Sequence, residues 1–213
     1  MMRLLALLLV LLGLASCGTV ARQDTAVGQA LTGIIGQTEF VPRFTALLQT
    51  DAPALQLGFV ESGSGGALLL EYRDGPYDYW LSPDGAQIIL QDGLLHGTRG
   101  FGAGLLASDL SQPLARVASL SGGPADRFHT FLDGNDQAET RTYRCLFEDR
   151  GGREIDLATG PVQTRLLAED CRSLDQSFTN LYWVSVRGRQ IIQSRQWAGP
   201  YLGAISTRIV PPG

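Results

Sequence analysis

The first residue in the chain that could carry a chemical modification is Cys17, which follows an apolar run from Leu4 to Leu14. Arg3 precedes that run, and the small residues Ala15 and Ser16 separate it from the thiol. One cationic residue ahead of an apolar core is typical of an export signal, and small side chains before a cut suit the groove of a signal peptidase. At 1.5 Å per residue the run reaches about 16 Å, roughly half the apolar thickness of a bilayer, so it is too short for a stable membrane span.

The order Leu14-Ala15-Ser16-Cys17 resembles the lipobox of bacterial lipoproteins. We therefore expect residues 1–16 to be removed as a signal peptide, the thiol of Cys17 to accept a diacylglycerol, and the new amino group to accept a third acyl chain. Two or more chains give stable anchoring in a membrane, with residues 17–24 as the lipid tether. Gly18 follows the cysteine, rather than an aspartate. By resemblance to the sorted lipoproteins of two-membraned bacteria, this predicts the outer membrane and its periplasmic face. A secreted protein without lipid is the alternative.

Cys145 and Cys171 are the two cysteines that remain once Cys17 is lipidated. In an oxidising compartment two such cysteines usually pair, so we expect a disulfide between them. Neither lies in a Cys-x-x-Cys motif, and the chain has only 2 histidines. A zinc site is therefore not expected, and we expect neither a metal nor a cofactor.

The predicted disulfide meets a geometric objection. Three consecutive strands are expected around it, at residues 139–148, 153–157 and 162–169, with a turn at 150–152 between the first two. On a flat meander Cys145 lies near Val162, and Cys171 is 9 residues further on, which is about 30 Å. A disulfide needs Cα atoms within about 7 Å. The bond therefore requires that the chain bend back or that one predicted turn be absent.

The charge of the chain limits its partners. All 17 basic residues are arginines, and the loss of Arg3 leaves 16 of them against 21 acidic residues, a net charge of about −5. A net negative surface argues against broad binding of nucleic acid or acidic polymers. After Leu14 no apolar stretch approaches 18 residues, so lipid is the only membrane anchor that we expect.

No spacing in the chain predicts a nucleophile, a base and an orienting group. Ser62 and Ser64 lie in a glycine-rich run without the order Gly-x-Ser-x-Gly. His96 and His129 are each expected to be strand histidines with one hydrogen bond. The glycines of residues 100–104 lack the spacing of a dinucleotide loop. Acidic residues occur mostly in Asp-Gly turns, although the two carboxylates of a glycosidase can lie far apart in a chain. We therefore predict no catalytic residues.

Aromatic residues give a signal for a binding surface. One predicted strand holds Tyr77, Tyr79 and Trp80, and another holds Tyr182 and Trp183. Adjacent residues of a strand face opposite sides, so each strand places an aromatic on both faces. One face is core, and the other is either a surface for sugar or protein or a second packed layer. Together with two arginines that flank Gly188 at an expected hairpin tip, the candidate partner-binding residues are Tyr79, Trp80, Tyr182, Trp183, Arg187 and Arg189.

Short apolar runs bounded by turn residues dominate the rest of the chain. The pairs Asp74-Gly75, Asp84-Gly85 and Asp92-Gly93 are strong hairpin signals. They predict strands at residues 55–60, 67–72, 77–81, 87–91 and 94–99. Further strands are expected at residues 127–132, 178–186, 191–197 and 202–210, in addition to the three around the cysteines.

These strands predict a mainly β fold, with antiparallel meanders that form a sandwich or a barrel-like body. Helical spacing of apolar residues predicts a short N-terminal helix over residues 25–35, and residues 105–110 are expected to form one helical turn. Residues 25–213 are expected to form a single mainly β domain. Two halves joined near residues 100–126 are the alternative.

Residues 79–102 resemble the YjbF/GfcB family of exopolysaccharide and group 4 capsule lipoproteins. The resemblance lies in a Trp before a turn, an apolar strand that leads to Asp-Gly, a short strand that ends in Thr98-Arg99-Gly100-Phe101-Gly102, and the pair Leu105-Leu106. It also takes in residues 141–145 and 169–171, and with the lipobox it spans most of the mature chain. The resemblance implies a mostly β protein, bound to the outer membrane and encoded beside proteins that export surface polysaccharide.

Together these features favour a non-enzymatic accessory or scaffold protein in the assembly or export of extracellular or capsular polysaccharide. The expected partners are the membrane, through the N-terminal lipid, and other polysaccharide-export proteins. The polysaccharide itself is a further candidate, and nucleic acid is not. Two alternatives stay open: a periplasmic hydrolase or lyase that modifies polysaccharide, and a structural lipoprotein of the envelope that contacts no polymer.

Overall fold

The computed structural model describes residues 40–132, 135 and 137–211. The expected signal peptide, Cys17, the tether at 17–24 and the helix expected over 25–35 lie outside the described residues. Within them, the helices α3 (Pro42–Leu47) and α4 (Ser111–Ser119) are short. None of the described helices is long and apolar enough to cross a membrane.

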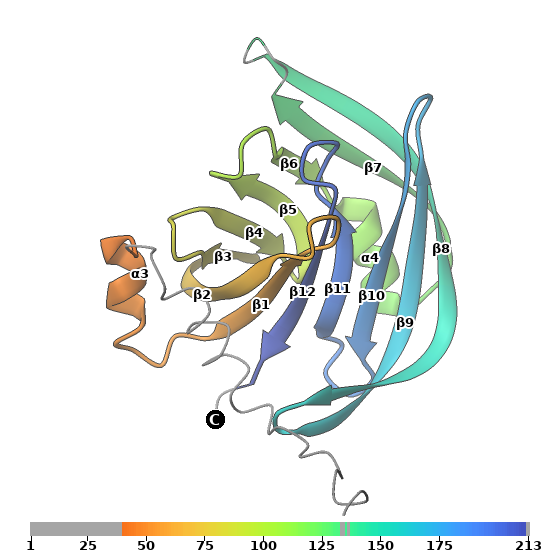
Figure 1. The fold of residues 1–213 in the computed structure, drawn as a ribbon. Helices are drawn as coiled ribbons and strands as arrows, with labels where there is room; N and C mark the ends of the chain where they lie inside the picture. The colour runs from red at the N-terminus through yellow and green to blue at the C-terminus, as the bar shows by residue number, and fades with distance from the viewer. Residues whose placement is uncertain (1–39, 133–134, 136, 212–213) are drawn as a thin grey trace, which may run out of the picture.

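Twelve strands form one antiparallel sheet (Figure 1). They are β1 (Ala54–Phe59), β2 (Gly65–Asp74), β3 (Tyr77–Leu81), β4 (Gln87–Gln91), β5 (Leu94–Arg99), β6 (Leu105–Asp109), β7 (Gly123–Leu132), β8 (Ala138–Leu157), β9 (Gly160–Arg172), β10 (Ser177–Ser185), β11 (Ile191–Trp197) and β12 (Ala204–Val210). From β1 to β5 and from β6 to β12 each strand pairs with the next one in the chain, and β12 returns to pair with β1. Short turns such as Asp92-Gly93, where both residues have a positive φ, make these reversals.

The sheet curls into a nearly closed barrel whose open seam lies between β5 and β6, the two ends of the strand order. These strands still lie side by side. The Thr98 hydroxyl donates to the carbonyl of Leu105 over 3.3 Å, and Nδ1 of His96 lies 3.0 Å from the carbonyl oxygen of Ser108. The prediction of a mainly β fold with a barrel-like body is therefore confirmed, and strands from both halves of the chain share one sheet.

Two hydrophobic clusters fill the barrel. The first consists of Leu55, Leu57, Leu68, Trp80, Ile88, Leu90, Leu95, Leu105, Phe131, Ala198 and Ile205. The second consists of Leu94, Leu110, Val117, Ala125, Phe147, Leu167, Tyr182, Val184 and Ile191. Opposite walls of the barrel are in direct contact between the two clusters. The side chain of Gln196 on β11 accepts from the backbone N–H of Leu95 on β5 over 2.8 Å and donates to the carbonyl of Gly93 over 3.0 Å. The interior is thus packed core.

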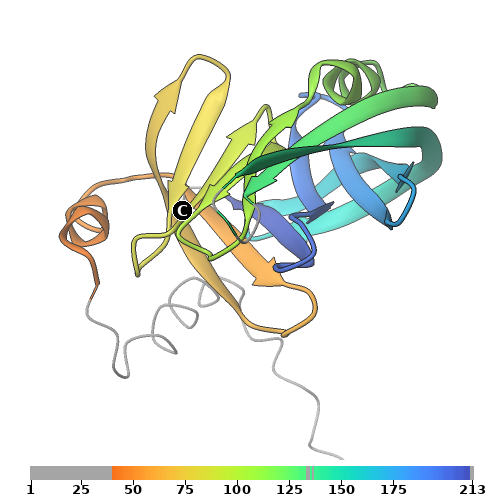
Figure 2. The same ribbon diagram turned by 90° about the horizontal axis from the view of Figure 1, so that it is seen from above.

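The two helices in the described part of the chain, α3 and α4, lie on different sides of the barrel, as Figure 2 shows. Helix α4 follows β6 and places Val117 in the second interior cluster. Helix α3, which begins at Pro42, buries Phe44 completely against Leu69 and Leu81 of β2 and β3. Since Trp80 belongs to the interior cluster, its neighbour Leu81 faces outward, so α3 covers the outside of the barrel.

Two local predictions are wrong. Residues 105–109 form strand β6 instead of a helical turn, because they pair with β7 along one edge of the sheet. The turn expected at residues 150–152 is absent, and the strand expected at 153–157 continues β8, which runs unbroken for 20 residues. A β-bulge stands in place of the turn: three steps along β8 from Asp149 to Gly152 match two steps along β9. Gly151 supplies the positive φ of +82° that this bulge uses.

The missing turn resolves the geometric objection to the disulfide. Because β8 does not reverse at residue 150, β9 pairs directly with the part of β8 that carries Cys145, and Cys145 stands opposite Cys171. The two Cα atoms are 4.0 Å apart and the sulfurs are bonded. Both residues are buried, at 2% and 1% exposure. The predicted disulfide is confirmed.

Candidate functional site

A row of rings lies on the outer face of β2, β3 and β5. Tyr72 and Tyr79 stand opposite each other on neighbouring strands, with ring centroids 4.2 Å apart and planes 16° from parallel. The guanidinium of Arg99 lies 5.7 Å from the centre of the Tyr79 ring, and Tyr77 packs against His96 with centroids 4.8 Å apart. Tyr72 is 45% exposed. We call these five residues the outer tyrosine surface.

The turn between β2 and β3 positions this surface. It holds two residues, and the register that it sets places Tyr72 across from Tyr79. A β-bulge in β2 directly before Tyr72 helps to aim its side chain. Because adjacent residues of a strand face opposite sides, Tyr79 lies outside the barrel while Trp80 enters the core.

A hollow of about 290 Å³ opens at one end of the barrel, where the β4–β5 turn faces the β10–β11 turn. The two turns approach closely, since a Cβ placed on Gly93 would lie 3.0 Å from the side chain of Ile191. We call this the mouth hollow. Its lining joins buried apolar residues with a polar rim, and the residues that matter below are Asp78, Trp80, Leu90, Asp92, Arg189 and Ile191.

Some polar groups of the mouth hollow have a hydrogen-bond or ion-pair partner and others have none. Asp78 accepts a 2.8 Å bond from Nε of Arg73, its cross-strand partner. Asp92 and Arg189 are exposed turn residues with φ of +48° and +55°, and neither forms an ion pair with any of the described residues. Trp80 is 6% exposed, and its indole N–H has no acceptor in the part of the chain that the structure describes.

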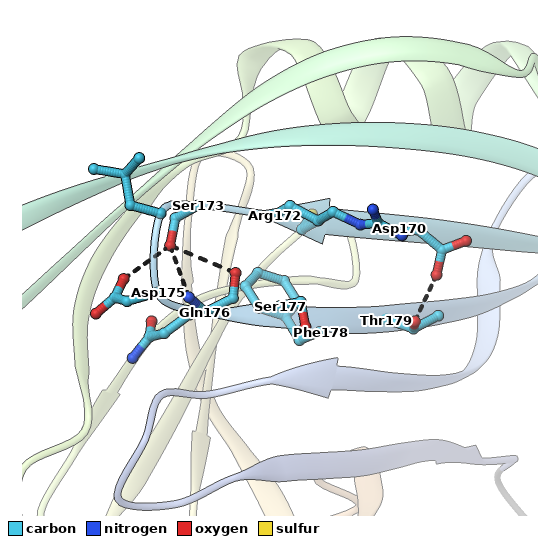
Figure 3. Close-up of a pocket in the computed structure, with 10 residues that line it drawn as sticks. Asp170, Arg172, Ser173, Asp175, Gln176, Ser177, Phe178 and Thr179 are labelled. Carbon is cyan, nitrogen blue, oxygen red and sulfur yellow. Dashed lines mark hydrogen bonds between the residues drawn. The ribbon is translucent and has the colours of Figure 1, made fainter.

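A second hollow, of about 540 Å³, lies along the β9–β10 hairpin (Figure 3). Its lining comes entirely from residues 170–179. The polar groups bond to one another: the Ser173 hydroxyl donates to Asp175 over 3.1 Å, and the Thr179 hydroxyl donates to Asp170 over 2.5 Å. The hydroxyl of Tyr143 ties the turn to β8 through Gln176. These bonds stabilise the end of the hairpin, whereas Arg172 and Ser177, which also line the hollow, make no side-chain hydrogen bond with the other residues drawn.

Inside the barrel, a fully buried ion pair joins β7 to β9. Nε of Arg127 donates to Oε1 of Glu169 and Nη2 donates to Oε2, each over 2.9 Å. Tyr182 accepts from Arg127 over 3.0 Å and donates to Glu169 over 2.7 Å, and Asn180 donates to Glu169 over 2.8 Å. We call these four residues the core network. Burial lowers the pKa of Arg127, but the Glu169 carboxylate and the Tyr182 phenol together outweigh it, so the pKa is raised overall. Burial also raises the pKa of the Tyr182 phenol well above its ordinary value.

The core network lies beside the disulfide. Side-chain ligand atoms of Cys145, Glu169 and Cys171 are within 4.8 Å of one another. The sulfurs are bonded to each other, so they are not available as the thiolates that bind metal. The cluster is therefore a structural part of the core in this oxidised state.

His129 is a buried histidine among aromatic rings. It stacks on Phe178 with centroids 5.7 Å apart and meets Tyr143 edge to face. Neither ring nitrogen has a partner among the described residues, so the expectation of one hydrogen bond is wrong for His129 and right for His96. Burial, together with the Arg127 guanidinium, lowers the pKa of His129 well below its ordinary value of 6.5.

We predict that His129 makes stability fall in mild acid. Above pH 6.5 it is neutral in both states, and below that the unfolded chain takes up a proton that the folded chain refuses. The free energy of unfolding therefore drops as the pH falls below 6.5, with a slope that approaches about 1.4 kcal/mol per pH unit. His129→Phe should flatten the curve between about pH 6.5 and 5 and, by removing two unpaired nitrogens, should raise stability at neutral pH by about 1 kcal/mol. Urea unfolding at a series of pH values measures both effects.

His96→Gln is the matched control, because His96 is the other histidine, and burial lowers its pKa too while its bond to Ser108 opposes the shift. This variant should keep most of the acid dependence. An acid slope in His129→Phe as steep as in the unchanged protein would contradict the prediction.

The structure separates the six predicted partner-binding residues. Trp80 and Tyr182 are buried, so the expectation that they form an exposed surface is corrected: their strand faces are core. Trp183 belongs to a second packed layer with Ile155, Leu157, Val162, Ile192 and Ile209. Tyr79 lies on the outer tyrosine surface, and Arg187 is exposed at the β10–β11 turn. Arg189 borders the mouth hollow, which it shares with Trp80.

Sequence reasoning missed Tyr72, Arg99 and Asp92. A signal for Tyr72 was present, because a two-residue turn after Asp74 pairs Tyr72 with Tyr79 by simple counting. Arg99 reaches the same surface only because β4 and β5 follow β3 in the sheet. Asp92 meets Arg189 at one hollow only through closure of the barrel, which no local pattern encodes.

Comparison with known proteins places the chain among lipoproteins of surface polysaccharide. The family model described as "Group 4 capsule polysaccharide lipoprotein gfcB, YjbF" matches residues 29–210. Among solved structures, the crystal structure of the hypothetical lipoprotein YmcC from Escherichia coli (K12) is similar, with 20% sequence identity, a TM-score of 0.68, and coverage of 92% of this chain and 98% of that chain. At that identity the likeness shows a shared fold. No curated protein matches the chain.

Proposed function

The chain belongs to the YjbF family of group 4 capsule polysaccharide lipoproteins, and from this premise we propose that it is an outer-membrane lipoprotein that serves as a non-enzymatic accessory or scaffold in the assembly or export of an extracellular or capsular polysaccharide. Membership in a lipoprotein family implies a membrane-anchored protein of the cell envelope. The lipobox at Cys17 supplies the anchor and Gly18 favours the outer membrane. Several lipid chains on Cys17 give the stable attachment that a scaffold needs.

The ionisable groups buried inside the barrel support a role without catalysis. Arg127, Glu169 and Tyr182 are fully buried and bond to one another, and His129 is sealed among rings. A group that cannot reach a substrate cannot transfer a proton to it. Within residues 40–211 as described, these groups are therefore parts of the packed core.

The outer tyrosine surface is the observation that carries the proposal. Stacked tyrosines beside an arginine are the kind of side chains that anchor interfaces, and here they lie on a rigid sheet, not on a loop. Tyr72 and Tyr79 present apolar rings with polar tips to solvent at low cost in side-chain entropy. The net charge of about −5 after processing makes a protein partner more favourable than an anionic polymer. We therefore propose another exported component of the polysaccharide machinery as the partner.

We predict that the double variant Tyr72→Ser/Tyr79→Ser loses polysaccharide export. Hot-spot aromatics contribute about 2 kcal/mol or more each, so affinity for the partner should fall by about 30-fold for one tyrosine and by up to about 1000-fold for both. The variant gene replaces the native copy in its own bacterium, and secreted polysaccharide is measured against a deletion strain. Density-gradient fractionation checks that the protein still reaches the outer membrane.

Tyr201→Ser is the matched control, because Tyr201 is 68% exposed, lies in the β11–β12 turn and is not one of the five residues of the outer tyrosine surface. Export should be unchanged in this variant. Normal export by the double variant would overturn the assignment of the surface. Release of new reducing or unsaturated ends when the purified protein is incubated with the polysaccharide of its own bacterium would overturn the non-enzymatic role.

A further inference from the structure

The mouth hollow contains a buried donor without a partner. Trp80 lines the hollow, is 6% exposed, and has no acceptor for its indole N–H among the described residues. Leaving such a group unsatisfied costs about 1–3 kcal/mol. Buried polar groups of native proteins usually have partners, so each exception calls for an explanation. The nitrogen itself has almost no accessible surface, so a molecule in the hollow can supply the missing bond only if the indole ring shifts toward it.

The rim of the hollow offers charged groups of both signs on opposite walls. Asp92 comes from the β4–β5 turn and Arg189 from the β10–β11 turn, and neither has an ion-pair partner among the residues described. Asp78 adds a second carboxylate on the β3 side. The floor is apolar and includes Leu90 and Ile191, both buried. A molecule that fits this lining has a ring of hydroxyl groups and an apolar face.

We propose that the mouth hollow binds one neutral pyranose unit of a glycan. The sugar's hydroxyls donate to the carboxylates of Asp92 and Asp78, its oxygens accept from Trp80 and Arg189, and its C–H face lies against the apolar floor. The rim carries no net charge, because Arg73 pairs with Asp78 and Arg189 balances Asp92, so an anionic sugar gains no electrostatic advantage over a neutral one. An acyl chain would strip water from the charged rim without replacing its hydrogen bonds. The volume of about 290 Å³ is at the lower end for ligand sites, which suits a single unit.

The inference rests on the proposed role in polysaccharide export for its choice of a sugar, but it concerns a different part of the molecule. The outer tyrosine surface lies on the outside of the barrel, while Trp80 faces the interior. A failure of the tyrosine variants to affect export therefore leaves sugar binding in the hollow unaffected. A failure of sugar binding likewise leaves the partner surface in place.

The three tryptophans of the chain allow a direct test. In the ¹⁵N-labelled full chain, held in a detergent without a sugar head group, the indole N–H signals of Trp80, Trp183 and Trp197 are followed by NMR, and Trp80→Phe assigns the first. Glucose, galactose and mannose are added in turn to about 100 mM, since a single small ring is expected to bind with a Kd of the order of 1 mM. We expect the Trp80 signal to move saturably with at least one of them while the other two stay in place.

Variants locate the binding and give the outcomes that would overturn it. Asp92→Asn and Arg189→Gln remove one charge each and keep a side chain of similar size. Each should weaken binding by about tenfold or more. Arg187→Gln, two positions away on the same turn but outside the lining, should leave it unchanged. Glucuronate, the charged counterpart of glucose, should bind no more tightly than glucose. No movement of Trp80 with any of the three hexoses, equal effects of the Arg187 and Arg189 variants, or tighter binding of glucuronate would each refute the proposal.

Discussion

Replacing Glu169 by Gln is expected to lower the free energy of unfolding by about 3–5 kcal/mol, the range seen when one partner of a buried ion pair is removed. The side chains of Glu169 and Arg127 are 0% and 2% exposed. An arginine cannot shed its proton to escape burial, so Arg127 would be left as an uncompensated charge. The introduced amide would also turn an N–H group toward a guanidinium N–H. Urea unfolding at neutral pH, followed by tryptophan fluorescence, measures the loss.

The double variant Arg127→Met/Glu169→Gln tests whether the charge is the cause. It removes the buried cation, and the oxygen of the introduced amide can still accept from Tyr182 and Asn180. More than half of the lost stability should return, because buried ion pairs are often replaceable by uncharged groups of similar size. Asp126→Asn is the matched control on the outer face of the same strand. It breaks an ion pair to Arg144, which is 79% exposed, and should cost less than about 1 kcal/mol. Equal losses in Asp126→Asn and Glu169→Gln would contradict the prediction.

The core network marks a limit of what the sequence predicts. Arg127, Glu169, Asn180 and Tyr182 come from three strands, and nothing in their spacing shows that they share an interior. A polar residue in an alternating strand is normally assigned to the solvent face, and Arg and Glu are almost never fully buried unless paired. The pairing depends on β7 and β9 flanking β8, so it is a property of the assembled sheet.

Local turn chemistry, by contrast, predicts most of the fold. The turns that contain Gly75, Gly85 and Asp92-Gly93 each separate two observed strands, because these residues adopt the positive φ that such turns need. The hairpin signals do not decide which of the neighbours Tyr79 and Trp80 faces outward, so both were candidates for a partner-binding surface, and only the assembled barrel shows that Trp80 is core. The site at the mouth was predicted only as separate pieces, Trp80 and Arg189. Barrel closure brings them together.

The glycines at 151 and 152 show why a turn signal can mislead. The segment Arg150-Gly151-Gly152 has the composition of a hairpin turn, yet Gly151 serves a bulge within a continuous β8. Gly151 donates its N–H to the carboxylate of Asp149 over 2.8 Å, and Arg165 of β9 pairs with the same carboxylate. These contacts hold both sides of the bulge to the neighbouring strand. The pairing of Cys145 with Cys171 depends on this continuity.

Removal of the disulfide by Cys145→Ala/Cys171→Ala is expected to lower the free energy of unfolding by about 3–4 kcal/mol. The cysteines are 26 residues apart, and in the chain-entropy model a loop of that length loses this much entropy in the unfolded state. Most of the effect arises in the unfolded chain, so the denaturant slope should also rise, because an unfolded chain without the cross-link exposes more surface. Urea unfolding of the variant and of the oxidised protein gives both quantities.

The unchanged protein with its disulfide reduced is the control for the loss of packed atoms. It lacks the cross-link, but both thiols remain beside Tyr143 and Phe178. If the cross-link is responsible, the reduced protein and the double variant should lose similar stability, and the variant should lose somewhat more for the missing sulfur atoms. The folded protein should resist reductant, because both cysteines are almost completely buried, and the bond should become reducible only as the chain unfolds. Two titratable thiols in unfolded, unreduced protein, or an oxidised protein no more stable than the reduced one, would contradict the role assigned to this bond.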